Sequence, residues 1–233
     1  MSAVFRRAVG LAAVMFILLP IAARGFDLSA GLKAGVAMPF YSGPGYTAWL
    51  SDVGLTPNLA FRFGGGLFLT VGMADLLALQ PEVFYSVLGG LSGSSDYALW
   101  RDKMPALDGQ LLLKLRFRLR GFKRLELFAG PQAILKLGEA SFVLEDWSGY
   151  ATGTWNDFYL EDLSFGVVGG IGWVYLRGRT LFSVDARYCH GLSSRFNSAS
   201  GYGDWYQNVV QLMFGIGRQL TGGRMTPKPG RTR

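Results

Sequence analysis

One side chain of the chain could act as a general base near neutral pH, the single histidine His190. Ser193 and Ser194 follow it closely, and Asp185 and Asp204 are near it in the sequence. A hydrolase would need one of these serines within hydrogen-bond reach of the imidazole and one carboxylate to orient the ring. His190 instead falls on the apolar side of the strand expected around it. We therefore expect a histidine at the edge of an apolar face, and no catalytic residue.

Metal and redox chemistry have few candidate ligands. Cys189 is the only cysteine, so neither an intrachain disulfide nor a cysteine-based metal site can form. One histidine without a carboxylate-rich cluster beside it gives no metal site either. We expect no metal and no cofactor.

Charged residues recur at alternate positions of otherwise apolar segments. In residues 107–119 the odd positions are mostly leucine, whereas the even positions include Asp108, Lys114, Arg116 and Arg118. Successive side chains of a β-strand point to opposite sides, so this segment has one apolar and one charged face. Its length is close to the roughly 9 to 11 residues with which a tilted strand crosses a bilayer. The pattern predicts a transmembrane strand.

The same alternation recurs along the chain and predicts an all-β protein. An even number of antiparallel strands can close into a membrane barrel with up-and-down topology. Pro81 cannot donate a ladder hydrogen bond, so we expect a bulge or distortion at that position. The eight predicted strands are residues 28–40, 58–71, 77–87, 107–119, 125–137, 162–175, 180–190 and 208–220.

The connections between these strands alternate in length. Short turns at one end and long loops at the other are typical of outer-membrane barrels, with turns in the periplasm and loops at the cell surface. We expect the protein to lie in the outer membrane of a diderm bacterium, with both of its termini in the periplasm. The short connections are 72–75, 120–124 and 176–179, and the long ones are 41–57, 89–106, 138–161 and 191–207.

The direction of the polar face distinguishes a membrane barrel from a soluble lipocalin-type barrel, whose exterior is polar. The polar face is rich in glycine, which suits a narrow lumen better than a surface in water. An eight-stranded barrel is just wide enough for side chains to fill it, which favours a packed charge network over a solute path. The predicted lumen network comprises Lys33, Arg62, Glu82, Asp108, Lys114, Arg116, Arg118, Glu126, Lys136, Asp162, Asp185 and Arg187.

The net charge of +7 indicates no nucleic-acid partner. Its excess lies outside residues 26–220, which we predict to be the barrel domain. Residues 1–25 resemble a secretory signal peptide, with two arginines before an apolar run; a retained membrane anchor is the alternative. Residues 221–233 form a basic tail that we expect to be disordered, and without these two ends the chain has no net charge.

Aromatic residues are frequent in the long connections. Such residues form girdles at membrane interfaces, and they also offer large contact areas to proteins, glycans or hydrophobic ligands. Both readings stay open. The candidate binding residues are Trp49, Trp100, Trp147, Trp155, Trp205 and Tyr206.

In its leader, its eight alternating strands and its short and long connections, the chain resembles small eight-stranded outer-membrane proteins of the OmpX, OmpW and OmpA-barrel kind. The resemblance implies a barrel in contact with outer-membrane lipid. We expect a non-enzymatic structural or interaction protein, adhesin-like, with an extracellular protein or glycan as partner. One alternative is an OmpW-like carrier of small hydrophobic molecules, with a lateral opening near Pro81 or in the glycine-rich sixth strand. A lipid-modifying enzyme is the weaker alternative.

Overall fold

The computed structural model describes residues 27–93, 98–146, 149–155, 161–195 and 203–221. The predicted signal peptide and all but the first residue of the predicted tail lie outside these ranges. Within them, no helix combines the length and the apolar character that crossing a bilayer would require.

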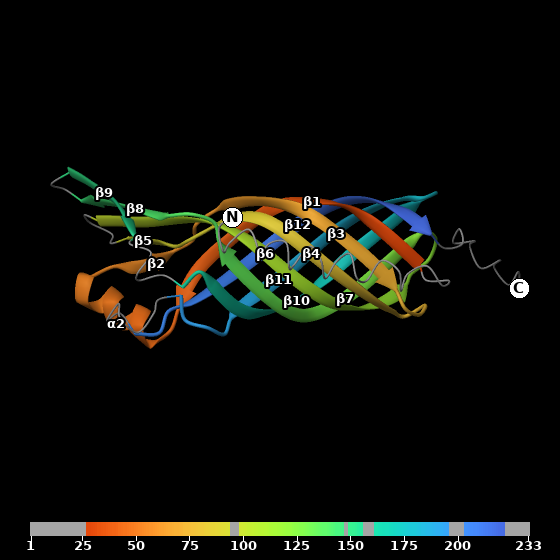
Figure 1. The fold of residues 1–233 in the computed structure, drawn as a ribbon, viewed down its shortest axis with the longest axis horizontal. Helices are drawn as coiled ribbons and strands as arrows, with labels where there is room; N and C mark the ends of the chain where they lie inside the picture. The colour runs from red at the N-terminus through yellow and green to blue at the C-terminus, as the bar shows by residue number, and fades with distance from the viewer. Residues whose placement is uncertain (1–26, 94–97, 147–148, 156–160, 196–202, 222–233) are drawn as a thin grey trace, which may run out of the picture.

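Eight long strands form a closed antiparallel barrel, as the alternating pattern predicted (Figure 1). Each strand pairs with its neighbour along the chain, and the last pairs with the first, so the barrel wall has no free edge. The wall strands are β1 (Asp27–Ser42), β3 (Arg62–Gly72), β4 (Leu77–Leu88), β6 (Ala98–Arg118), β7 (Lys123–Lys136), β10 (Leu163–Arg177), β11 (Thr180–Gly191) and β12 (Tyr206–Thr221).

The barrel wall is apolar outside and polar inside, which confirms the predicted direction of the two faces. Phe63 is 76% exposed, and Leu32 and Phe214 also face outward. Lys33 and Asp185, at alternate positions, are buried in the lumen. A water-soluble protein buries its apolar side chains and exposes its charges, so this wall fits lipid rather than water.

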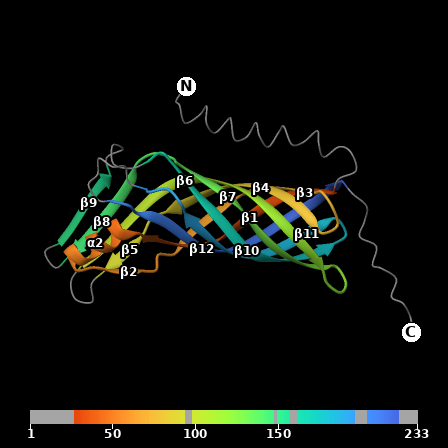
Figure 2. The same ribbon diagram turned by 90° about the horizontal axis from the view of Figure 1, so that it is seen from below.

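A second antiparallel sheet projects from one end of the barrel, where the sequence predicted only long loops (Figure 2). Residues 98–103 extend β6 beyond the wall and pair there with short strands on both sides. This outcome corrects the predicted loops 41–57, 89–106 and 138–161, and it also places Asn58 outside β3. The sheet order is β2 (Thr56–Asn58), β5 (Leu91–Gly93), β6, β8 (Ala140–Asp146) and β9 (Gly149–Trp155).

Helix α2 (Pro44–Val53) occupies the first connection and lies beside this sheet. Pro44 stands at its start, where a missing N–H costs no helical hydrogen bond, and Gly54 ends it with φ 67° in the left-handed region. We call α2, β2, β5, residues 98–103, β8 and β9 the projecting region. Its end of the barrel is the loop end, and the opposite end, with the short connections, is the turn end.

The predicted distortion at Pro81 is present, as an interruption of a ladder and not as a bulge. Between β3 and β4, Phe68 pairs with Glu82 and Val71 pairs with Leu79, but the two intervening pairs are missing. The register is the same on both sides of this gap. The proline removes a donor while the strand keeps its alignment, because β6 pairs with Pro81 from the other side.

Candidate functional site

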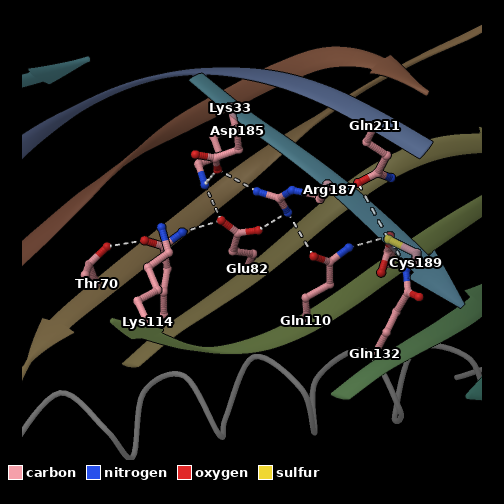
Figure 3. A network of polar contacts seen from close by, with 12 residues as sticks. Lys33, Thr70, Glu82, Gln110, Lys114, Gln132, Asp185, Arg187, Cys189 and Gln211 are labelled. Carbon is pink, nitrogen blue, oxygen red and sulfur yellow. Dashed lines mark hydrogen bonds and ion pairs between the residues drawn. The ribbon is translucent and has the colours of Figure 1, made fainter. Parts of the chain in front are cut away.

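Four charged side chains meet in the middle of the lumen (Figure 3). The Lys33 ammonium lies 2.5 Å from a carboxylate oxygen of Glu82 and 2.5 Å from one of Asp185. The Arg187 guanidinium lies 2.6 Å from Glu82 and 2.7 Å from Asp185. We call these four residues the ionic quartet. It has no net charge, and its members come from β1, β4 and β11.

Polar side chains extend the quartet along the lumen. Gln80 donates to Glu82 and accepts a hydrogen bond of 2.6 Å from Thr70. On the other side, Arg187 donates to Gln110 at 2.9 Å, and Gln110 donates to Asp108 at 2.9 Å. The polar contacts of these strands thus form one connected network across the barrel.

Aromatic rings stand beside the lumen cations. The Lys33 ammonium lies 5.1 Å from the centre of the Phe68 ring, and the Arg187 guanidinium lies 5.3 Å from that of Phe128. The faces of aromatic rings attract cations, so these contacts add to the ion pairs. An isolated buried charge costs several kcal/mol, and mutual pairing removes most of that cost. The quartet can therefore close the middle of the lumen.

The structure brings most of the predicted lumen residues together in the interior, although three of them are exposed or only half-buried. Arg118 bonds Asp75 at the turn end with its side chain 56% exposed, and the Asp162 side chain, 3.5 Å from Lys136, is 59% exposed at the loop end. Arg62 is half-buried at the loop end. Alternation assigns a side but no depth, which explains these three outcomes. The buried nine are Lys33, Glu82, Asp108, Lys114, Arg116, Glu126, Lys136, Asp185 and Arg187.

An apolar cluster fills the lumen toward the loop end, and the sequence reasoning missed it. Trp205 is 1% exposed and contacts the rings of Tyr41, Tyr46 and Trp49 at centroid distances of 5.5, 5.0 and 5.2 Å. Its other buried members include Leu50 and residues from most of the wall strands. The clustering of aromatics in the first and last connections was the available signal. We call this group the aromatic plug.

The predicted binding aromatics therefore have different environments. Trp205 is buried and Trp49 partly buried in the aromatic plug, so Trp205 offers no free binding surface. Tyr206 begins β12, which corrects its assignment to a loop. Trp100 lies in β6 and Trp155 ends β9, where the strands but not these side chains are described. Trp147 lies outside the described residues.

A buried carboxylate, Asp102, joins the projecting region to the barrel. Its side chain accepts hydrogen bonds of 2.5 Å from the Tyr41 hydroxyl and from the Gly90 backbone N–H. Its backbone carbonyl accepts one of 3.1 Å from Arg62. Asp102 belongs to the part of β6 beyond the barrel wall. Burial raises the pKa of its carboxyl to about 6, although the hydrogen bonds from Tyr41 and Gly90 act in the opposite direction.

The groups around His190 do not form the geometry of a hydrolase. Its Nδ1 lies 2.8 Å from the Asn208 side-chain oxygen. The Ser193 hydroxyl accepts from the Phe165 backbone N–H, and the Ser194 hydroxyl accepts from that of Trp205. Asp185 belongs to the ionic quartet. Both serine hydroxyls and Asp185, one of the two candidate carboxylates, are engaged elsewhere.

Metal ligands are not gathered at any point of the described chain. Within those residues, no three histidine, cysteine or acidic side chains come close enough to hold an ion together. The sole cysteine, Cys189, is buried.

Two of the hollows on the described surface bear on binding. One, of about 600 Å³, is in the projecting region between the end of β1, α2 and β2, and Tyr41, Leu50 and Ser51 are among its lining residues. The other, of about 510 Å³, is on the outer wall over β12, β1 and β3. The wall shows no lateral opening along the glycine-rich β10, which pairs with β7 and β11 along its length.

Solved structures of bacterial outer-membrane proteins resemble this fold at low sequence identity. OprG of Pseudomonas aeruginosa is 13% identical over 85% of this chain and 98% of its own, with a TM-score of 0.47. Neisserial surface protein A is 12% identical over 82% and 97%, with a TM-score of 0.42. Ail of Yersinia pestis is 11% identical over 82% and 99%, with a TM-score of 0.38.

No curated protein sequence matches the chain. The model of one protein family, described as the outer membrane protein beta-barrel domain, matches residues 24–197. This match covers most of the chain and agrees with the closed barrel, its apolar exterior and its polar lumen. The chain therefore belongs to the family of outer-membrane proteins with a β-barrel domain.

Proposed function

We propose that this protein is a non-enzymatic surface protein that binds an extracellular protein or glycan through its projecting region. The observation that carries the proposal is the contrast between a barrel closed by side chains and a second sheet that extends beyond it. In this role the barrel anchors the sheet in the outer membrane.

The filled lumen supports anchoring rather than transport. Glu82 and Asp185 are almost fully buried in the quartet, and Trp205 and Tyr41 close the lumen nearer the loop end. A solute would have to separate ion pairs of 2.5 to 2.7 Å and displace packed rings. Small eight-stranded barrels have interiors that side chains can fill completely, and this one follows that rule.

The projecting region supports partner binding. β9 pairs with β8 on one side, and the described residues provide no strand on its other side. The free edge of a sheet presents unpaired backbone donors and acceptors that another chain can use. The 2.5 Å hydrogen bond from Tyr41 to Asp102 holds the region against the barrel, and the 2.8 Å contact between the hydroxyls of Tyr46 and Ser92 joins α2 to β5 within the region. A firmly held surface loses little entropy when it binds.

The proposal requires the loop end to face the cell exterior and the termini to face the periplasm. Lys103 in the projecting part of β6 and Lys123 at the turn end are both exposed. We expect a membrane-impermeant maleimide to label Lys103→Cys on intact cells, and Lys123→Cys only after the outer membrane is opened. The buried Cys189 provides the unlabelled background. The opposite labelling pattern would invert the orientation.

Removing the edge hairpin tests the binding role directly. We replace residues 140–155, which form β8 and β9, with a short Gly-Ser linker and measure the binding of expressing cells to immobilised extracellular proteins. Sucrose octasulfate, the heparin analogue bound in one structure of Ail, serves as the glycan probe. The expected result is loss of binding with an unchanged heat-dependent gel shift, which reports a folded barrel. Binding that survives the deletion would contradict the proposal.

The hollow beside α2 favours one second candidate, a carrier of small hydrophobic molecules. Its volume of about 600 Å³ falls within the roughly 300 to 1,000 Å³ of small-molecule pockets. Ser51 lines the hollow, so Ser51→Trp should then reduce the uptake of an apolar fluorescent dye. Ala48→Trp, on the exposed side of the same helix, is the control. Equal uptake by both variants and the wild type would dismiss this candidate.

A further inference from the structure

The outer wall of the barrel has a hollow in its apolar surface. It has a volume of about 510 Å³, and Leu32 and Ala34 of β1, Leu67 of β3, and Phe214 and Ile216 of β12 line it. Ala34 is paired with Phe214 on one side and with Gly65 on the other. Two small outward-facing residues thus adjoin each other among large ones.

Packing within the barrel does not require these small residues. A Cβ built on Gly65 would meet no atom nearer than 3.4 Å, and Gly65 has no positive φ. The inward-facing Gly66 differs, because its Cβ would lie 2.0 Å from the Val83 carbonyl oxygen. Gly66 is therefore needed to form the wall, whereas a larger residue at position 34, which lines the hollow, or at position 65, which is paired with position 34 beside it, would only reduce the space there.

The hollow offers no charge to a ligand. Lys33 is the one charged residue in its lining, and the Lys33 ammonium is turned into the lumen, where it bonds Glu82 and Asp185. A lipid headgroup would therefore find no ionic partner here. An uncharged hydrocarbon chain matches the lining, since its burial requires no polar contact.

We propose that this hollow binds one acyl chain of a membrane phospholipid. It is continuous with the apolar wall that already contacts lipid. Leu32 and Ala34 are the sixth and eighth of the sixteen residues of β1, and Phe214 and Ile216 are the ninth and eleventh of the sixteen of β12, so the hollow lies in the turn-end half of these two strands, close to their middle. The choice of a phospholipid rests on the proposed orientation, in which this half spans the periplasmic leaflet.

A second copy of the chain fits the hollow less well. The lining comprises eight residues, whereas a stable protein interface uses roughly 20 to 30 on each side. A two-fold dimer also brings the same surface of both copies together, so a hollow near the axis would face another hollow.

Two substitutions reduce the hollow, one from its lining and one from the adjoining position of β3, and two matched ones add the same side chain elsewhere on the outer wall. Ala34→Leu and Gly65→Leu are the test variants. Ala186→Leu on β11 and Gly169→Leu on β10 are the controls, and a Cβ on Gly169 would meet no atom nearer than 3.8 Å. Each full-length protein is extracted from membranes in mild detergent, checked for its heat-dependent gel shift, and analysed by native mass spectrometry.

We expect the wild type and both controls to retain one phospholipid through detergent exchange. Both test variants should retain it about tenfold less, which corresponds to roughly two methylene groups excluded from the hollow. Equal retention in all five proteins, or none in the wild type, would overturn the proposal. Retained lipopolysaccharide, or a dimer that the test variants lose, would overturn it in favour of that occupant. The cysteine labelling above reports separately whether the orientation itself is wrong.

Discussion

The middle of the barrel and its loop end are both closed by side chains, but they are closed by different chemistry. In the middle, Lys33, Glu82, Asp185 and Arg187 each contact two oppositely charged partners. At the loop end, Trp205 packs among other rings. Removing one member of the quartet leaves an uncompensated charge, whereas removing one ring loses only its own contacts. Loss of one quartet residue should therefore destabilise the whole barrel, whereas loss of one ring should weaken only the loop end.

The largest effect should come from Asp185→Ala. This change leaves Lys33 and Arg187 sharing the single carboxylate of Glu82, and breaking a buried ion pair in this way costs roughly 3 to 5 kcal/mol. Urea unfolding in lipid bilayers, followed by gel shift, measures the loss of stability. A cost below about 1 kcal/mol, the value typical of a surface pair, would show that the quartet does not act as a unit.

Trp205→Ala should destabilise the protein by about 3 kcal/mol, the lower end of the range for a large aromatic residue replaced by alanine. The loss should be confined to the loop end, because the ladders of the barrel wall do not depend on this ring. Limited proteolysis should cut the projecting region while the gel shift of the barrel persists. Simultaneous loss of both would mean that the aromatic plug holds the wall itself.

A third prediction concerns Asp102, which joins the projecting region to the barrel. Its pKa is raised by burial from the usual 3.8 to about 6, so folding favours the protonated carboxyl. The resulting stabilisation of the projecting region is complete below about pH 4 and is lost as the pH rises through 6. Proteolysis of this region should therefore be faster at pH 8 than at pH 5, and Asp102→Asn should reduce that difference. An unchanged pH dependence in the variant would assign it to another group.

The smallest effect should come from Asp75→Ala at the turn end. Its contact with Arg118 is 3.0 Å long but largely exposed, and such pairs contribute roughly 0 to 1 kcal/mol. The same urea titration provides the measurement and sets the baseline for Asp185→Ala. A larger loss of unfolding free energy here would mean that depth in the barrel does not determine how much an ion pair contributes to stability.

Local sequence patterns predicted the wall but not the contacts inside it. Alternation has a period of two residues, so it places Lys33 and Asp185 on the inward face without reference to any other strand. It cannot pair them, because they are separated by more than 150 residues and meet only when the barrel closes. Helix α2 was missed although Pro44 and Gly54 marked its ends. The second sheet was missed because its strands are short and pair only with one another and with the extension of β6.

The composition of the ionic quartet bears on how the chain enters a membrane. Lys33 and Glu82 come from the first three wall strands, whereas Asp185 and Arg187 are two residues apart on β11. Each of these pairs is electrically neutral by itself. Neither pair therefore adds net charge to its own part of the chain before the barrel closes, and the cross-contacts form as β12 meets β1. The four residues then connect β1 and β4 to β11, on the two sides of the β1–β12 pairing that closes the barrel.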